Sequence, residues 1–256
     1  MKNNLAVKVE AEDRSGDFSP SEPAQAAAES QPIELDATEW TAQLRDASLR
    51  FLGSSVVEDS NLSIHAVQSE RTIVTTEGTR LQLPRTAVRL GIWARTTAAD
   101  GMDISVYESV DVRDPAKLPS GPDLHRLVDA VEARVAALAV APVVEPTAAP
   151  AILRGRAAAV FFHEVLGHRI EGHRQKDDDE GKTFTDKVGQ PILPQFISVI
   201  DDPTAAHEGD VVLNGHYTHD DEGVAAARTV IVDRGVLADF LTSRSPIEAT
   251  PASNGH

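Results

Sequence analysis

The sequence predicts an α+β protein, in which an N-terminal domain of helices and a β-meander precedes a mainly β domain. Two stretches carry apolar residues at helical spacing, and four short β-type runs lie between them. Further β-type runs follow a proline-rich stretch. Helices and consecutive antiparallel strands that are grouped separately along the chain are typical of α+β folds.

The composition narrows the class of function. A chain of 256 residues with 41% hydrophobic and 25% charged residues can form a substantial core. Its net charge of -16 and the lack of a large Lys/Arg cluster argue against direct nucleic-acid binding. Neither a signal peptide nor a run of about 20 apolar residues is present, which predicts a cytoplasmic protein without a membrane anchor. The absence of cysteine excludes thiolate as a metal ligand or nucleophile.

The first elements are a mobile N-terminal segment, residues 1–31, and a helix. Residues 17–31 mix Pro, Ser and Ala without an apolar period, which is typical of a surface segment. The helix should begin near Asp36 and Glu39, which have the spacing of a capping box. Its apolar face is formed by Trp40, Leu44, Ala47 and Phe51.

A β-meander and a second helix complete the predicted N-terminal domain, residues 32–140. Turn residues at Glu77-Gly78, Pro84 and Asp100-Gly101 separate the β-type runs. These runs are Leu62–Gln68, Arg71–Thr76, Thr86–Ala94 and Asp103–Val110. The second helix, Pro122–Leu138, places apolar residues on one face: Leu124, Leu127, Val128, Val131, Val135 and Leu138.

A linker divides the chain at residues 141–151, where three prolines occur in a stretch with almost no charge. The second domain, residues 152–256, contains a histidine-rich helix and an acidic run after Lys176, which is typical of a solvated loop. Its β-type runs are Gln195–Ile200, Val211–Leu213, Thr229–Val232 and Val236–Leu241.

The stretch FFHEVLGHRIEGH contains the parts of a zinc site. His163 and His168 offer imidazole ligands, and Glu164 is placed to act as a general base on metal-bound water. The two histidines are five residues apart, however, which corresponds to about 140° around a regular α-helix. A π-bulge would bring both rings to one side, and Gly167 is the position where such a distortion costs least.

Two other interpretations of this stretch remain open on spacing alone. A regular helix would instead align Glu164, His168 and Glu171, which also makes a plausible site of oxygen and nitrogen ligands. Alternatively, an apolar helix ends here in a solvated polar turn near Gly172.

A longer pattern resembles the TldD/PmbA family of zinc metallopeptidases. The resemblance rests on GRAAAVFFHEVLGHRIEGHRQ, FTDKVGQPILPQFISVIDDPT, DDEGVAAARTVIVDRGVLADFLTSRSP and the final SNGH. It implies a zinc-dependent peptidase that hydrolyses unfolded or extended peptides, with His163 and His168 as Zn²⁺ ligands and Glu164 as general base. It also implies pairing with a second, identical or related subunit as a homo- or heterodimer, and it favours the bulged helix.

The chain departs from the family in two ways. Members continue beyond the SNGH block, and one branch supplies a cysteine ligand from that later region, so the second domain is expected to be incomplete at its C-terminus. His173 is then a candidate third ligand, ahead of His216 and His219. The alternative function is a non-catalytic partner subunit or a truncated fragment of a TldD/PmbA-type complex. No substrate-binding residue is assigned.

Overall fold

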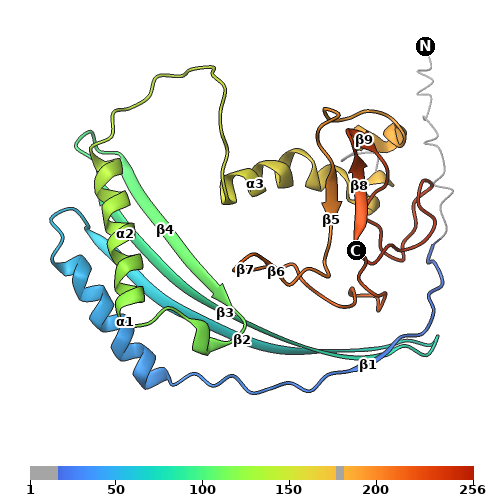
Figure 1. Ribbon diagram of the computed structural model, residues 1–256, viewed down its shortest axis with the longest axis horizontal. Coiled ribbons are helices and arrows are strands. Elements are labelled where there is room, and N and C mark those ends of the chain that lie inside the picture. Colours follow the sequence, from blue (N-terminus) through green and yellow to red (C-terminus); the bar gives the residue numbers. More distant parts are fainter. Residues whose placement is uncertain (1–16, 177–181) are drawn as a thin grey trace, which may run out of the picture.

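The computed structural model describes residues 17–176 and 182–256 and has the α+β architecture that the sequence predicts (Figure 1). The N-terminal part is a long, curved four-stranded sheet with two helices on one face. The C-terminal part combines a short α-helix, 3-10 turns and two small sheets. Residues 1–16 of the predicted mobile segment and the acidic run at 177–181 lie outside the described residues.

Helix α1 (Ala37–Leu52) begins at the cap that the sequence predicts. Asp36 Oδ1 accepts hydrogen bonds from the backbone N–H groups of Thr38 and Glu39, at 2.8 and 3.1 Å. These two N–H groups have no partner within the helix, so the cap stabilises its first turn. Glu39 Oε1 accepts from Gln43 Nε2, at 3.2 Å, on the outer surface of the helix.

The meander has three strands where four were predicted: β2 (Asp59–Val74), β3 (Arg80–Thr97) and β4 (Asp103–Val112). The expected division of β2 is wrong, because residues 59–74 pair with β3 without interruption. The two glycine turns are confirmed. Gly78 and Gly101 have φ values of 107° and 88°, a conformation that favours glycine.

The predicted break at Pro84 is also wrong, since β3 continues through it. Strand β1 (Gln25–Ala27) pairs in parallel with residues 80–82, and β4 pairs with residues 88–97. Between these two stretches, the described residues give β3 only β2 as a paired neighbour. A proline, which has no N–H to donate, is tolerated in such a half-paired stretch. Strand β1 also lies within the segment that composition predicts to be mobile.

Helix α2 (Pro122–Ala139) packs beside α1 on the sheet and forms the first core with it. The buried residues of α2 lie on its predicted face: Leu124, Val128, Val131 and Val135. They pack against Val88, Leu90, Ile92 and Ala94 of β3. Leu138 is half exposed, because the helix ends one residue later.

All residues from 140 to 155 are exposed and lie outside regular structure, and they form the arch between α2 and α3 (Figure 1). The elements that follow are α3 (Arg156–Val165), β5 (Val199–Asp201), β6 (His207–Glu208), β7 (Val211–Val212), β8 (Thr229–Asp233) and β9 (Val236–Leu237). Four 3-10 turns complete the structure: Pro115–Lys117, Gly167–Arg169, Gly172–Gln175 and Lys182–Lys187. A second core forms around β8 from Leu166, Ile170, Ile231, Val232, Leu237, Phe240 and Ile247.

Polar contacts connect the two parts of the chain. Arg113 Nη2 donates to the carbonyl of Leu213 at 3.1 Å, and Arg85 Nη2 donates to that of Asn214 at 2.6 Å. Both carbonyls follow β7, so the β6–β7 hairpin is held against the sheet, as Figure 1 shows. This arrangement places the hairpin below α3 in the view of Figure 1.

Candidate metal centre

The histidine-rich stretch begins as a regular helix and then leaves helical geometry. Helix α3 ends at Val165, and Leu166 has φ -120° and ψ -49°. A 3-10 turn, Gly167–Arg169, follows directly. Leu166 and Ile170 are both buried in the second core, so packing of these two side chains draws the chain inward at this point.

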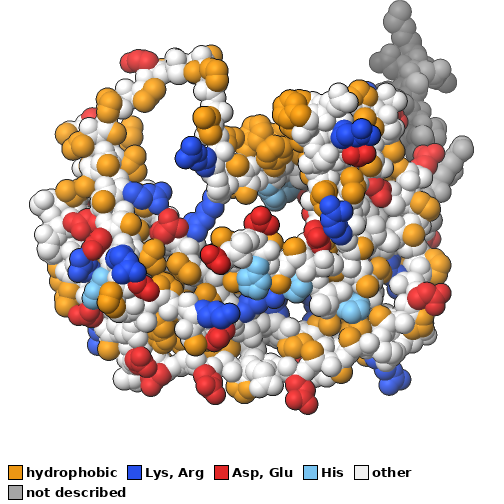
Figure 2. Space-filling view, viewed as in Figure 1, with side chains coloured by type: hydrophobic (Ala, Val, Ile, Leu, Met, Phe, Trp, Pro, Cys, Tyr) orange, Lys and Arg blue, Asp and Glu red, His pale blue; other side chains and the backbone are white. Residues whose placement is uncertain are grey.

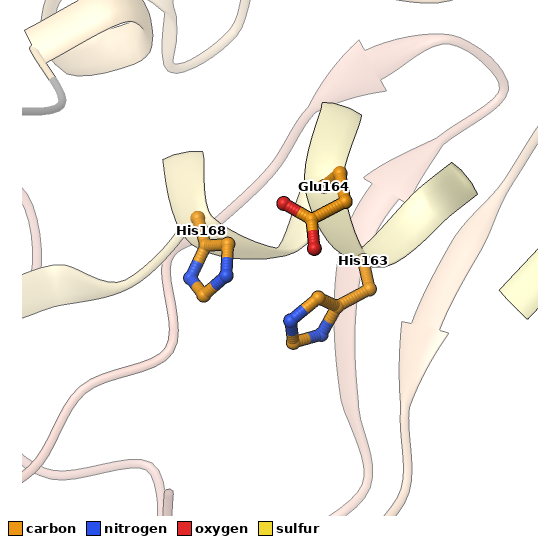
Figure 3. Close-up of side chains that lie close together, drawn as sticks. All are labelled: His163, Glu164 and His168. Atoms are coloured by element: carbon orange, nitrogen blue, oxygen red, sulfur yellow. The ribbon is translucent and has the colours of Figure 1, made fainter. Parts of the chain in front are cut away.

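This change of path brings the predicted ligands together (Figure 3). The ring centroids of His163 and His168 are 4.4 Å apart, with an angle of 72° between the ring planes. One ligand atom each from His163, Glu164 and His168 lies within 4.8 Å of the others. The two imidazoles therefore converge. They do so because the helix ends and a 3-10 turn follows, whereas a π-bulge was expected.

Gly167 is not the site of the distortion. Its φ is not positive, and a Cβ added there would meet His163 Nδ1 and the Phe162 carbonyl at 3.8 Å, an ordinary contact. The change in backbone direction occurs one residue earlier, at Leu166.

Glu171, the third member of the alternative straight-helix site, binds His168 from another side. Its Oε1 lies 2.8 Å from Nδ1 of His168, and its Oε2 pairs with Arg174. Partial burial raises the pKa of the Glu171 carboxyl, but hydrogen bonds from Arg174 and His168 outweigh burial and bring the pKa below its ordinary value. Glu171 is not part of the cluster that contains Glu164 and His168. The alternative site of Glu164, His168 and Glu171 is therefore not formed.

The donor set of His163, Glu164 and His168 fits zinc, which binds imidazole nitrogen and carboxylate oxygen. His163 and Glu164 are exposed and His168 is half-buried, so the centre is open to solvent on one side. A catalytic zinc needs such an open position for water or substrate. Among the described residues, this trio is the one cluster of its kind.

A cleft of about 600 Å³ is lined by Glu171, which contacts His168, but by no residue of the trio itself. His173, residues between 201 and 217, Leu241, Ser243 and His256 complete its lining. Sequence reasoning assigned no role to His256, which lines this cleft with a side chain only 6% exposed and Nε2 at 2.9 Å from Asp201 Oδ1. Burial, with Asp201 as a further cause, raises the pKa of Tyr217 in the same cleft to about 12, so its hydroxyl stays protonated.

Three comparisons relate the chain to known proteins. A model of the PmbA/TldA metallopeptidase C-terminal domain matches residues 146–255, which include the trio and all the cleft-lining residues except His256. By this match, residues 146–255 form a domain of the TldD/PmbA family. A metalloprotease of Methanocaldococcus jannaschii is 40% identical over 93 residues, or 36% of this chain and 19% of that protein.

Two further TldD/PmbA relatives are informative. A zinc metalloprotease TldD homologue of Saccharolobus solfataricus is 27% identical over 95 residues, covering 37% of this chain and 20% of its own. The crystal structure of TldE from Thermococcus kodakarensis superposes with a TM-score of 0.62 at 18% identity, over 97% of this chain and 55% of that one, which shows a shared fold. This chain therefore spans about half of the TldE chain, and its matches span about a fifth of these two metalloproteases.

Three other histidines of the second domain lie outside the trio. His173, the candidate third ligand, is exposed and faces Glu171 at 3.6 Å. His216 Nδ1 lies 3.0 Å from the Pro203 carbonyl, and His219 Nδ1 lies 3.2 Å from Thr218 Oγ1.

Two of the acidic residues of the second domain form turns. Asp202 Oδ1 accepts from the Thr204 backbone N–H at 3.1 Å, and Asp220 Oδ1 accepts from those of Glu222 and Val224 at 2.9 and 2.8 Å. No helix in the described part of the chain is long and apolar enough to cross a bilayer.

Proposed function

We propose that this chain carries the metal centre of a zinc-dependent peptidase that hydrolyses unfolded or extended peptides. The observation that supports the proposal most directly is the convergence of His163, Glu164 and His168 within 4.8 Å. Two similar proteins are named metalloproteases, one of them a zinc metalloprotease. A zinc ion bound by His163 and His168 would polarise a peptide carbonyl and lower the pKa of a coordinated water.

The residues of the centre divide the chemistry between them. His163 and His168 hold the metal through imidazole nitrogens. Glu164 takes the proton from the attacking water and returns it to the leaving amine, as a positioned carboxylate does in general acid–base catalysis. A carboxylate oxygen of Glu164 lies within 4.8 Å of a nitrogen of each ring, which supports this role.

The shape of the second part of the chain supports extended peptides as the proposed substrate class. Strand β5 forms one edge of its three-stranded sheet and pairs with β8. Its last residue, Asp201, lines the same cleft as Glu171. An extended peptide can add to such an edge by main-chain hydrogen bonds, and its next residues would then enter the cleft. A folded substrate does not offer a free strand of this kind.

The proposal is tested by replacing Glu164 with Gln, which keeps the size of the side chain and removes its basicity. Zinc content should persist, while hydrolysis of an unstructured peptide should fall by a factor of about 10²–10⁴. Glu208→Gln, an exposed change on β6, serves as the matched control and should retain activity. Undiminished turnover by the Glu164 variant would overturn the mechanism.

A second candidate function is a partner subunit that does not itself catalyse. If Glu164 serves as base, the described residues leave two imidazoles as ligands, whereas catalytic zinc sites have three protein ligands. A third ligand would then come from outside these described residues, for example from a second copy or a related subunit. The exposed apolar side chains of α3, which form an orange surface in Figure 2, support such pairing: Val160, Phe161, Phe162 and Val165.

Elemental analysis separates the two candidates. Stoichiometric zinc in protein purified without chelator supports the peptidase, whereas zinc at background level supports the partner subunit. Sedimentation of the chain alone and after mixing with a related subunit distinguishes a homodimer from a heterodimer.

A further inference from the structure

Glu171 occupies a position from which it controls one of the proposed ligands without joining the trio. Its Oε1 lies 2.8 Å from Nδ1 of His168. This nitrogen is one of only two on the imidazole ring, so a partner on Nδ1 decides which nitrogen is left for a metal.

The carboxylate of Glu171 is held on its other side. Arg174 Nε donates to Oε2, and His173 Nε2 lies 3.6 Å from the same oxygen. Because Oε2 has these partners, Oε1 remains directed at His168. The Glu171 side chain is 28% exposed, so it is partly shielded from water that would compete for the bond.

The backbone of Glu171 is fixed as firmly as its side chain. The N–H of Leu241 donates to the Ile170 carbonyl at 2.9 Å, and the N–H of Gly172 donates to the Leu241 carbonyl at 2.7 Å. Glu171 thus forms an isolated parallel β-bridge with Leu241. Leu241 is partly buried and packs against the second core. In addition, Gln175 Nε2 donates to the Glu171 carbonyl at 3.1 Å.

The tautomer of His168 follows from this geometry. A carboxylate accepts hydrogen bonds and has no proton to donate, so the bond requires a proton on Nδ1. In a neutral ring with Nδ1–H, Nε2 carries the free lone pair. A carboxylate in this role also orients the ring and increases the basicity of the ligating nitrogen.

We propose that Glu171 is a positioning residue that sets the tautomer and orientation of His168, so that Nε2 is the nitrogen offered to zinc. This inference rests on the proposed zinc site, but its first test does not need the metal. In the metal-free protein, ¹⁵N NMR of the imidazole rings should show a protonated Nδ1 and an unprotonated Nε2 at His168. The reverse pattern would overturn the inference.

Zinc affinity gives a second test, by competition with a chromophoric chelator. Glu171→Leu should weaken zinc binding about 10- to 100-fold. Glu171→Gln, whose amide oxygen still accepts from Nδ1, should lose less. Glu208→Leu removes the same charge from exposed β6 and should bind zinc as the parent does. Equal affinity in all three variants would contradict the proposal.

The outcomes separate this inference from the peptidase itself. If Glu164→Gln remains active but His168 shows the expected tautomer, the peptidase mechanism fails and the role of Glu171 stands. If the Glu171 variants bind zinc like the parent while Glu164→Gln is inactive, the role of Glu171 fails and the peptidase stands.

Discussion

The imidazole rings of His163 and His168 lie 4.4 Å apart, although five residues separate them in the sequence. On an uninterrupted α-helix, that spacing would direct the rings about 140° apart. The end of α3 at Val165 removes the difficulty, because the 3-10 turn that follows has a different rise and rotation. The chemistry of the centre thus depends on where a helix stops.

Both histidines should be needed for metal binding. His163→Ala or His168→Ala alone should reduce zinc to background, because either change leaves a single imidazole beside Glu164. His207→Ala, on exposed β6, is the matched control and should keep its zinc. Elemental analysis of protein purified without chelator measures the effect. Retention of stoichiometric zinc by either ligand variant would contradict the assignment.

The sequence indicates candidate members of this centre, but not the backbone that brings them together. The residue types at 163, 164 and 168 favour a zinc site only if the chain path directs both imidazoles to one point. The path itself is set by Leu166 and Ile170, which pack against Ile231 and Phe240 far along the chain. Spacing alone contains no information on such contacts. Only a weak local pattern indicates the contact between Glu171 and His168, namely a carboxylate three residues after a histidine.

Substitution by alanine should destabilise the protein at Gly172 but have little effect at Gly167. A Cβ at Gly172 would lie 2.6 Å from the Leu241 carbonyl oxygen and 2.8 Å from Thr242 Cγ2. Gly172→Ala should therefore lower the free energy of unfolding by about 1–3 kcal/mol. Gly167→Ala, with its nearest neighbours at 3.8 Å, should change it by less than about 0.5 kcal/mol.

Chemical denaturation of both variants measures these differences, with Gly215→Ala as the control, since a Cβ there meets nothing within 4 Å. Equal stability of the Gly172 and Gly215 variants would show that the close approach to Leu241 does not constrain position 172.

Local patterns were sufficient for the helices and the glycine turns of the N-terminal part. Asp36 caps α1, and the buried face of α2 follows its apolar period. The continuity of β2, the passage of β3 through Pro84 and the pairing of β1 were not predicted. All three features depend on pairing between strands. The partner strand supplies backbone hydrogen bonds that residues nearby in the sequence cannot provide, even to a polar or proline-containing stretch.

Arg244 should connect the N-terminal segment, the sheet and the second part of the chain. Its side chain is 3% exposed, donates to the Ser19 carbonyl at 2.8 Å, pairs with Glu77 and lies 4.1 Å over the Phe18 ring. Arg244→Met keeps apolar bulk but removes these hydrogen bonds, so the thermal midpoint should fall. The exposed Arg234→Met is the control and should leave the midpoint unchanged. Limited proteolysis should detect release of the segment near Ser19 in the Arg244 variant alone.

Asp111 should make the structure sensitive to acid. Burial raises the pKa of its carboxyl, but Arg89, which donates to both oxygens at 2.8 and 3.1 Å, outweighs burial, and the pKa lies below its ordinary value. A carboxyl with a lower pKa in the folded state stabilises that state above the unfolded pKa of 3.8. This contribution is lost as the pH falls through the folded value.

The comparison that isolates this contribution is Asp111→Asn, which keeps the shape of the side chain and cannot ionise. At about pH 7 the variant should be less stable than the parent by about 1 kcal/mol, since Arg89 is half exposed, and the difference should shrink below about pH 4. Asp103→Asn on the same strand breaks a more exposed pair with Arg95 and should have a smaller effect. Urea denaturation across this pH range measures both variants. A difference that is independent of pH would mean that Asp111 stabilises the sheet by shape and hydrogen bonding, without its charge.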